Sequence, residues 1–388
     1  MSDGSKTIGV VSSSRADYGH LYWVLRELAA SEAIDLRLYV TGAHLLKEYG
    51  QTVEVIRRDG FEVAAEVPCM DEGDDSDAGM ARGIGRAVSG FAEAFEQERP
   101  DVLVVTADRY EMMGPACAAM SMRIPIAHIE GGERSEGAID QSVRDALSMM
   151  GHVHFATTAN AGQRLIEMGE EAWRVHVAGA ASLDHLKRST LLDKTALQQR
   201  LGIDLSERPV VACVHPVTLD SDATCEGRAV LDALEQVEGP IVFCFPNADA
   251  GGRRLMELAQ AFCKRRADAH LFDNLEPITY WSLLKHAACL VGNSSSGVME
   301  AASLGLGAVD VGTRQEGREV GQNVLRVPAD QQAVIGSVKI ARSDAFRTKI
   351  VGLANPYGDG DAARRIRITL EQLELGDRLL RKRLGGKH

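Results

Sequence analysis

The sequence predicts an α/β protein made of two doubly wound domains. Short apolar runs of strand length alternate with amphipathic helical stretches, and this βαβ rhythm is typical of parallel sheets with helices on both faces. The rhythm pauses in the polar stretch from Leu183 to Glu207 and restarts after Pro209. A chain of 388 residues also exceeds the size at which one hydrophobic core stops growing. We therefore expect one domain over residues 1–185 and a second over residues 186–359.

The strands are predicted where apolar residues form short runs between turn-forming residues. In the first domain these runs are Thr7–Val11, Leu36–Val40, Val102–Thr106, Ile124–Ile129, His154–Ala156 and Val175–Val177. In the second domain they are Val210–Val214, Ile241–Phe245, Ala269–Phe272, Leu290–Gly292, Ala308–Val311 and Val324–Val327. Tyr18–Ala30 has the spacing of an amphipathic helix, and Leu183–Glu207 reads as a helical connector.

Composition and charge exclude several classes of partner. A formal net charge of −12 and only 5% aromatic residues argue against a nucleic-acid partner. Apolar stretches are far shorter than the roughly 20 residues that span a bilayer, so no membrane partner is expected. Seven cysteines, without any C-x-x-C spacing, suggest buried reduced thiols. Because the N-terminus also lacks the pattern of a secretion signal, we expect a cytoplasmic protein.

The strongest sign of chemistry is the segment from His128 to Glu133, which follows an apolar strand. Open parallel sheets place reactive groups at the carboxyl ends of their strands. Glu130 lies in this segment, Asp140 lies behind it, and Asp108 and Arg109 follow another strand toward the same edge. Crowded carboxylates acquire different pKa values, which can supply both an acid and a base. An ion pair or a helix cap would explain Asp108 and Arg109 equally well.

Several histidines lie at predicted strand ends or in nearby turns: His44, His128, His152, His154 and His215. Structural hydrogen bonding is the more common role of a single histidine. His152 and His154 would share one face of a strand, but no compact ligand spacing completes a zinc site, so no metal is expected. His215 ends the first strand of the second domain, where it could contact a phosphate or donate a proton to it.

Three loops are candidates for holding an anion. Gly292–Gly297 places Ser294, Ser295 and Ser296 before a helix, which favours a phosphate cradle over a simple cap, and Glu300 would then accept hydrogen bonds from ribose. Arg314 adds a cationic donor from the next strand. The loop with Arg15 and the loop with Asn247 are weaker candidates, because a plain turn would explain each of them.

Taken together, these segments resemble the hydrolysing UDP-N-acetylglucosamine 2-epimerases of the sialic and legionaminic acid pathway type. The motifs that carry the resemblance are Arg15–Gly19, Asp108–Glu111, His128–Glu133, His215–Thr218, Pro246–Gly251, Gly292–Gly297, Arg314–Arg318 and Asn355–Gly360. The resemblance implies a glycosyltransferase-B architecture with the active site in the interdomain cleft, and a C-terminal helix at about 360–385 that completes the first domain. It also implies a nucleotide-sugar substrate, no cofactor, and a homodimer or homotetramer.

The implied reaction is elimination followed by hydration. A base removes the C2 proton, the nucleoside diphosphate leaves C1, and water adds to the glycal, so that UDP-N-acetylglucosamine yields N-acetylmannosamine for nonulosonic acid biosynthesis. By motif, Asp108, Glu130 and Asp140 are the acid and base candidates, with His215 near the leaving phosphate. The substrate-binding candidates are Arg15, His44, Arg109, His152, His154, Asn247, Ser294, Ser295, Ser296, Glu300 and Arg314.

Two positions depart from the family pattern and leave alternatives open. Asp145 and Met149 stand where relatives usually carry His and Lys. The same reaction on a GDP- or UDP-linked 4-acetamido-6-deoxy sugar is one alternative. Others are a non-hydrolysing epimerase, whose first loop typically reads Arg-Pro-Glu, a glycosyltransferase, and a catalytically silent nucleotide-sugar-binding protein.

Overall fold

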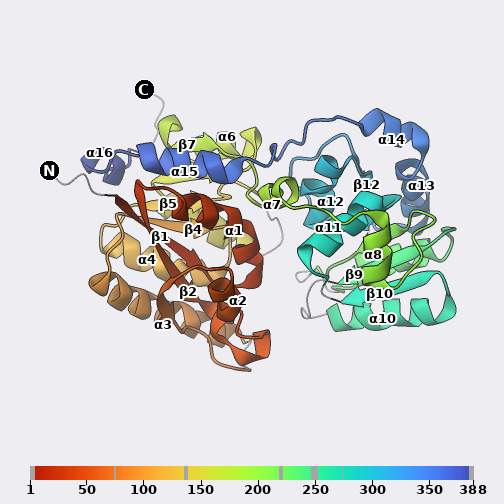
Figure 1. Cartoon of the computed structure of the whole chain (residues 1–388), viewed down its shortest axis with the longest axis horizontal. Helices are drawn as coiled ribbons and strands as arrows, with labels where there is room; N and C mark the ends of the chain where they lie inside the picture. Colours follow the sequence, from red (N-terminus) through yellow and green to blue (C-terminus); the bar gives the residue numbers. More distant parts are fainter. Residues whose placement is uncertain are drawn as a thin grey trace. The chain divides into compact units, whose positions relative to one another are not determined.

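The computed structural model describes residues 5–73, 76–134, 139–217, 222–245, 252–273 and 275–383. Its contacts divide the chain into two compact units, and Figure 1 shows the path of the chain through both of them. Unit 1 comprises Met1–Glu133, Ile139–His185 and Gly360–His388, and unit 2 comprises Arg134–Ala138 and Leu186–Asp359.

Unit 1 is built on a seven-stranded sheet in the order β3-β2-β1-β4-β5-β6-β7, with every neighbouring pair parallel. Its strands are β1 (Lys6–Ser12), β2 (Ile34–Thr41), β3 (Val63–Val67), β4 (Val102–Thr106), β5 (Ile126–Ile129), β6 (Val153–Ala156) and β7 (Val175–Val177). Because Thr106 of β4 pairs with Ile129 of β5, these two strands end side by side. The residues that follow them therefore leave the sheet at adjacent points.

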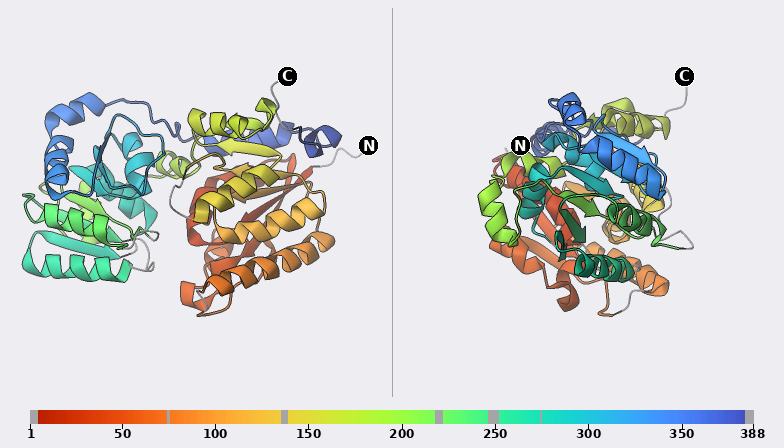
Figure 2. Two further views of the ribbon diagram at one scale, coloured as in Figure 1. Left: turned by 180° about the vertical axis from the view of Figure 1, so that it is seen from behind. Right: turned by 90° about the vertical axis from the view of Figure 1, so that its right-hand side faces the viewer.

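Helices cover both faces of this sheet. They are α1 (Arg15–Ala29), α2 (Val53–Arg58), α3 (Asp77–Gln97), α4 (Met113–Ser121), α5 (Ile139–Met150), α6 (Ala159–Glu167), α15 (Ala362–Gln372) and α16 (Asp377–Leu380). Alternate strand residues serve the two faces: Val10 packs with α1 and α15, whereas Val11 packs with α3 and α4. The helices α1 and α15 lie side by side in Figure 1, and α3 packs against α4 in Figure 2.

The segment that begins at Gly360 belongs to unit 1 although it follows all of unit 2 in sequence. Asp184 accepts hydrogen bonds from the backbone N–H groups of Ala362 (2.8 Å) and Ala363 (3.0 Å), so its carboxylate caps the start of α15. Lys6 donates to the carbonyl oxygens of Leu370 (3.1 Å) and Leu373 (2.5 Å) at the other end of the same helix. Both ends of α15 are thus fastened to the unit that forms the N-terminal half of the chain.

Unit 2 contains a six-stranded parallel sheet in the order β10-β9-β8-β11-β12-β13. Its strands are β8 (Val210–Cys213), β9 (Ile241–Phe245), β10 (Ala269–Asp273), β11 (Cys289–Gly292), β12 (Ala308–Val311) and β13 (Val324–Val327). Its helices are α8 (Lys194–Leu201), α9 (Cys225–Leu234), α10 (Gly252–Arg265), α11 (Pro277–His286), α12 (Ser295–Met299), α13 (Gln331–Ala341) and α14 (Asp344–Ile350). The short helix α7 (Ser182–Arg188) connects the two units. The predicted pair of doubly wound domains is confirmed.

The structure corrects two details of the strand prediction. The edge strand Val63–Val67 was not predicted, because its sequence Val-Ala-Ala-Glu-Val is short and only partly buried. The strand predicted from Ile124 begins instead at Ile126, after Pro125, which has no N–H to donate to a ladder.

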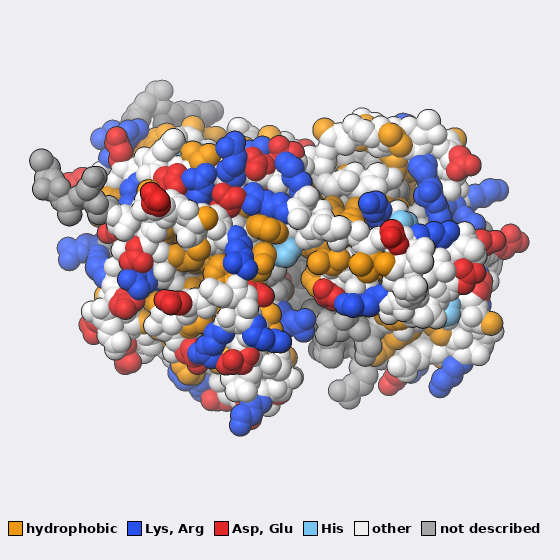
Figure 3. Space-filling view, viewed as in Figure 1, with side chains coloured by type: hydrophobic (Ala, Val, Ile, Leu, Met, Phe, Trp, Pro, Cys, Tyr) orange, Lys and Arg blue, Asp and Glu red, His pale blue; other side chains and the backbone are white. Residues whose placement is uncertain are grey.

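The exposed surface is charged and polar, and the helices are of ordinary length. On the face shown in Figure 3, acidic and basic side chains are interspersed over both units. Among the described residues, no helix is long and apolar enough to cross a bilayer.

Candidate active site

Two turns at the carboxyl edge of unit 1 carry the carboxylates Asp108 and Glu130. The first turn contains Ala107, with a φ of +56°, and the second contains Glu130 itself, with a φ of +65°. Both values lie in the left-handed region, which non-glycine residues seldom occupy and which is often found at functional sites. The turns follow β4 and β5, whose last residues are paired in the sheet. As predicted from the topology, the two carboxylate-bearing residues leave the sheet at neighbouring positions.

Arg144 of α5 joins these two turns. Its Nη2 forms an ion pair with Oδ2 of Asp108, and its Nη1 donates to the carbonyl oxygen of Glu130 at 2.7 Å. The Arg144 side chain is only 3% exposed, so this ion pair is largely shielded from water. Asp140 lies on the same helix, one turn before Arg144, and is exposed. The helix α5 therefore brings a cation and a third carboxylate toward the edge.

The carboxylate of Glu130 has a histidine partner that the sequence reasoning did not identify. Nδ1 of His20 lies 2.7 Å from Oε1 of Glu130, and their side chains are 34% and 7% exposed. His20 is on α1, more than a hundred residues away in sequence, and no motif marked it. A histidine and a carboxylate at hydrogen-bond distance can pass a proton between them.

Asp145, one of the two residues that depart from the family pattern, also forms an ion pair in unit 1. Its two carboxylate oxygens accept hydrogen bonds from Arg164 of α6, both at 2.8 Å. Arg164 also approaches the carbonyl oxygen of Glu133 at 3.4 Å, and the buried Glu133 carboxylate accepts a hydrogen bond from Thr157. Asp145 therefore neutralises an arginine that supports the end of the Glu130–Glu133 turn.

The Arg15 loop is organised by Asp17. This carboxylate accepts hydrogen bonds from the backbone N–H groups of Ser13 and Ser14, both at 2.6 Å, and from both hydroxyls. Asp17 is thus the third residue of a capping box whose N-cap is Ser14. The Ser13 and Ser14 N–H groups are therefore bound to Asp17 and not available to an anion. Arg15 is exposed at the start of α1 and remains a candidate anion ligand.

His44 and Arg109 lie beside this loop but have structural partners. His44 is fully buried, with its ring nitrogens 2.9 Å from the Ser12 hydroxyl and 2.7 Å from the Thr52 hydroxyl. Burial lowers the pKa of His44, so its imidazole is neutral at physiological pH. Arg109 donates to Glu111 at 2.7 Å. These contacts fix the loops around the edge.

His152 and His154 lie away from the carboxyl edge. His152 precedes β6, and its Nδ1 accepts a hydrogen bond from the backbone N–H of Ile126 at 3.1 Å. His154 is buried, and its Nε2 lies 3.1 Å from Oε2 of Glu170. Burial lowers the pKa of His152 to about 4 and also lowers that of His154. We therefore leave both out of the proposed site, because the structure gives them partners in the interior.

At the carboxyl edge of unit 2, one asparagine connects three loops. Oδ1 of Asn293 accepts a hydrogen bond from the backbone N–H of His215 at 2.7 Å, and its Nδ2 donates to Oε2 of Glu226 at 2.7 Å. Oε1 of the buried Glu226 accepts a hydrogen bond from the backbone N–H of Thr313 at 2.6 Å. Nη1 of Arg314 donates to the Asn293 carbonyl oxygen at 3.0 Å. The predicted residues His215 and Arg314 are thus brought together by Asn293 and Glu226, which the prediction missed.

His215 is a neutral group in this edge. Burial and the neighbouring Arg314 guanidinium lower the pKa of His215 to about 3. A neutral imidazole can donate one N–H to a phosphate oxygen, but it carries no charge to offer. Positive charge at this edge therefore comes from Arg314.

A cavity of about 230 Å³ lies in unit 2 and contains three of the predicted residues. It is lined by Cys213, Cys244, Leu275, Pro277, Tyr280, Trp281, Ser294, Ser296 and Glu300. The Ser294 hydroxyl caps α12 by accepting a hydrogen bond from the Ser296 N–H at 3.4 Å, and Ser295 opens that helix outside the cavity lining. The mostly apolar wall from α11 was not predicted. Asn247 lies outside the described residues.

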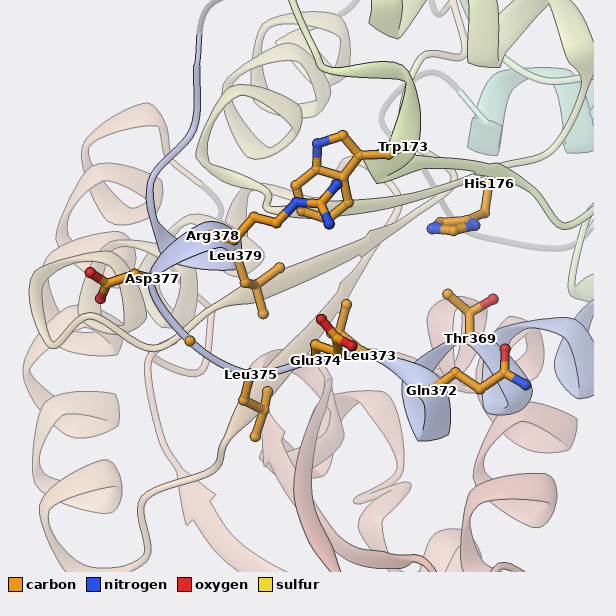
Figure 4. A pocket seen from close by; sticks show the side chains of 11 residues that line it. Trp173, His176, Thr369, Gln372, Leu373, Glu374, Leu375, Asp377, Arg378 and Leu379 are labelled. Atoms are coloured by element: carbon orange, nitrogen blue, oxygen red, sulfur yellow. The ribbon is translucent and has the colours of Figure 1, made fainter.

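A second cavity, of about 450 Å³, lies in unit 1 between Trp173, His176 and the segment around α16, and Figure 4 shows its lining side chains. The Arg378 guanidinium lies 4.5 Å from the centre of the Trp173 ring and covers one part of that lining. None of the predicted site residues lines this cavity. The candidate functional residues therefore lie at the carboxyl edge of each sheet, and each edge is described by itself.

Comparison with known proteins identifies the family. A family model described as UDP-N-acetylglucosamine 2-epimerase matches residues 26–371. The chain belongs to this family. Its predicted resemblance to the 2-epimerases is thereby confirmed.

Curated relatives match over most of their length. The chain is 35% identical to the UDP-N,N'-diacetylbacillosamine 2-epimerase (hydrolyzing) of Legionella pneumophila, over 96% of this chain and 97% of that protein. It is 34% identical to the GDP/UDP-N,N'-diacetylbacillosamine 2-epimerase (hydrolyzing) of Campylobacter jejuni, over 82% and 84%. It is 30% identical to the UDP-N-acetylglucosamine 2-epimerase of Neisseria meningitidis, over 87% and 88%.

Solved structures share the fold. A UDP-N-acetylglucosamine 2-epimerase structure from Listeria monocytogenes aligns with a TM-score of 0.79 and 18% identity, covering 96% of this chain and 99% of that one. The Neisseria meningitidis enzyme bound to UDP-GlcNAc aligns with a TM-score of 0.72 and 20% identity, covering 95% of this chain and all of that one. The predicted glycosyltransferase-B class, with two Rossmann-like domains, is thereby confirmed.

Proposed function

We propose that the chain is a hydrolysing 2-epimerase of a nucleotide-activated 2-acetamido sugar. The observation that carries this proposal is the pair of left-handed turns in unit 1, which hold Asp108 and Glu130 on neighbouring strand ends under one buried arginine. A glycosyltransferase has no need for such a carboxylate pair. The family match supports an epimerase over a transferase.

The two carboxylates have different partners, and this difference suggests their roles. Asp108 is paired with the Arg144 guanidinium, which stays charged at every physiological pH. Glu130 is paired with His20, whose imidazole can take up or release a proton. We assign to Glu130 the removal of the C2 proton, which Glu130 then passes to His20. Asp108 and the exposed Asp140 would orient the sugar and deliver a proton to C2 in the second half-reaction.

In the proposed reaction, the C2–H bond breaks toward Glu130 while the C1–O bond breaks toward the nucleoside diphosphate. The glycal then takes OH from water at C1 and a proton at C2 on the opposite face, which releases the 2-epimeric free sugar. Bond making and breaking balance with water as the second substrate. No redox change occurs.

Unit 2 would hold the leaving nucleotide. Arg314 supplies positive charge, and the neutral His215 supplies an N–H donor to a phosphate oxygen. Ser294, Ser296 and Glu300 line the cavity, where a hydroxyl-rich wall and a carboxylate suit ribose hydroxyls and the apolar α11 wall suits a nucleobase. Ser295, Asn247 and Arg15 remain further candidate ligands for the nucleotide.

For the sugar, we propose a 2,4-diacetamido donor of the N,N'-diacetylbacillosamine type ahead of UDP-N-acetylglucosamine. The support is the higher identity to the two diacetylbacillosamine enzymes, at 35% and 34%, than to the Neisseria enzyme, at 30%. With this donor, the product would enter nonulosonic acid biosynthesis. We further propose a cytoplasmic homodimer or homotetramer, as the family resemblance implies.

A donor panel tests the reaction and the substrate together. The protein is incubated with UDP- and GDP-linked N,N'-diacetylbacillosamine and with UDP-N-acetylglucosamine, in H₂¹⁸O and separately in D₂O. We expect a free 2-epimeric sugar that carries ¹⁸O at C1 and deuterium at C2, with the diacetamido donor turned over fastest. Intact epimerised nucleotide sugar would instead identify a non-hydrolysing enzyme, and tight binding without turnover would identify a sensor.

A further inference from the structure

We propose that His128 is a positioning residue that holds the Asp108 turn in its catalytic conformation. This inference rests on the proposed function, because it assigns His128 a role in presenting one of the proposed acid and base groups. His128 lies on β5, one residue before the end of the strand, and is fully buried. It cannot contact substrate from that position, so any role in the reaction acts through its neighbours.

The ring of His128 has one defined tautomer. Its Nε2 lies 2.8 Å from the carbonyl oxygen of Ala107, which can only accept, so Nε2 must carry the hydrogen. The other nitrogen, Nδ1, is then unprotonated and accepts a hydrogen bond from the hydroxyl of Ser148 at 3.1 Å. Burial lowers the pKa of His128 to about 3, so the ring stays neutral and keeps this arrangement across the working range of an enzyme.

Both polar groups of Ala107 are thereby bound to β5. Its N–H donates to the carbonyl oxygen of Ile129 at 2.9 Å, and its carbonyl oxygen accepts from His128. A left-handed φ of +56° is unfavourable for alanine and persists only where surrounding contacts impose it. The next residue is Asp108, so the hydrogen bond from His128 sets the direction in which that side chain leaves the sheet.

The same ring also touches the second turn. A Cβ on Gly131 would lie 2.9 Å from Nδ1 of His128 and 3.0 Å from the Ser148 hydroxyl, so no side chain fits there. Ser148 and Arg144 are four residues apart on α5 and therefore share a face of that helix. Arg144 contacts both turns, through Asp108 and the Glu130 carbonyl oxygen. The His128 ring donates to the Ala107 carbonyl oxygen of the first turn and lies close to Gly131 of the second. These contacts give a structural role to the histidine that stands two residues before Glu130.

Two amide substitutions separate positioning from general packing. In H128Q, the amide nitrogen occupies a position close to Nε2 and can still donate to Ala107. In H128N, the amide reaches only the Nδ1 position and leaves the Ala107 carbonyl without its donor. With the preferred donor, we expect H128N to lower kcat about a hundredfold and H128Q to stay within about tenfold, with KM unchanged in both.

A second measurement does not depend on turnover. Amide hydrogen exchange at Ala107 and Asp108 should accelerate in H128N relative to wild type and remain slow in H128Q, while UDP affinity stays unchanged in both variants. Equal losses of kcat and equal exchange in the two variants would overturn the positioning role. If wild-type protein turns over no donor, the proposed function fails, and the exchange comparison still decides whether His128 holds the turn.

Discussion

The turns at the two sheet edges are held in place by different means. In unit 1, the left-handed residues beside or bearing the two carboxylates, Ala107 and Glu130, are not glycines, and charged or imidazole side chains hold them in place. In unit 2, the corresponding left-handed positions are glycines: a Cβ on Gly292 would lie 2.0 Å from the Cys213 carbonyl oxygen, and one on Gly312 would lie 2.0 Å from Glu226. Glycine adopts these angles freely, and the network around Asn293 that orders the loops is built around the carboxylate of Glu226.

This difference matches the two proposed tasks. Strained non-glycine turns place carboxylates in defined directions, which proton transfer requires. Glycine turns let the backbone approach a ligand closely, which suits a nucleotide-binding edge. The comparison predicts that substitutions in unit 1 change turnover, whereas substitutions in unit 2 change nucleotide affinity.

The largest expected effect is the loss of turnover in Glu130→Gln and Asp108→Asn. Each change removes a proposed proton-transfer or sugar-orienting carboxylate without altering volume, so we expect kcat to fall about a thousandfold. UDP affinity, measured by titration calorimetry, should stay within twofold. Glu167→Gln, an exposed glutamate on α6, is the matched control and should retain wild-type kcat. A large change of UDP affinity in D108N or E130Q would contradict the division of tasks.

The second prediction concerns the buried carboxylate of unit 2. Glu226→Ala would leave the Thr313 N–H and one N–H of the Asn293 side-chain amide without an acceptor, at a cost of about 2–3 kcal/mol in the free energy of unfolding. The loops of His215 and Arg314 would lose their common support, and UDP affinity should fall about tenfold. Denaturant unfolding and calorimetry measure the two effects. Retained UDP affinity in a folded E226A protein would remove Glu226 from the nucleotide edge.

The third prediction is that the stabilities of the two units depend differently on pH. Among the described residues, His44, His128, His152, His154, His176 and His185 in unit 1 have lowered pKa values, whereas in unit 2 only His215 does. As the pH falls, such imidazoles become protonated in the unfolded chain at a higher pH than in the folded chain. Their stabilising effect is therefore complete above about pH 6.5 and is lost as the pH falls toward the folded pKa.

We therefore expect unit 1 to unfold first in acid. His152→Asn keeps an acceptor for the Ile126 N–H but cannot titrate, so between pH 6.5 and about pH 4 it should flatten the dependence of stability on pH by about 1.4 kcal/mol per pH unit. Thermal unfolding at several pH values measures this slope. An H152N slope equal to that of wild type would show that His152 does not contribute.

The smallest expected effect is that of Asp145→Asn. The Asp145–Arg164 pair is partly exposed, with side chains 30% and 21% accessible, so its loss should cost under about 1 kcal/mol of stability. Because Arg164 also supports the Glu133 carbonyl, kcat should fall only a few fold. Donor preference should be unchanged. A switch of donor preference in D145N would instead make Asp145 a specificity residue.

Much of the fold follows from local pattern. Buried parallel strands are continuous apolar runs, and most of them were predicted to within a few residues for that reason. The strand Val63–Val67 escaped because an edge strand is short and half exposed, so its sequence lacks that signal.

Site residues were predictable only where they end a strand. Asp108, Glu130, His215 and the Ser294 loop follow strands directly, so topology alone brings them to an edge. His152 and His154 followed the same motif logic, but they lie at the other end of their strand and in the interior. No sequence pattern predicted the role of Lys382. Its Nζ donates to the carbonyl oxygens of Met149 (2.8 Å) and Gly151 (2.7 Å) at the end of α5.

The sequence by itself therefore determined the fold class and the strand ends at which chemistry is expected, because these depend on periodicity and on residues close together in the chain. Only the tertiary structure decided which charges meet. His20 reaches Glu130, Glu226 joins the loops of unit 2 and Arg164 pairs with Asp145, because packing brings together helices and turns that are distant in sequence. Ion pairs and hydrogen bonds depend on distances of about 3 Å, which no spacing along a chain specifies.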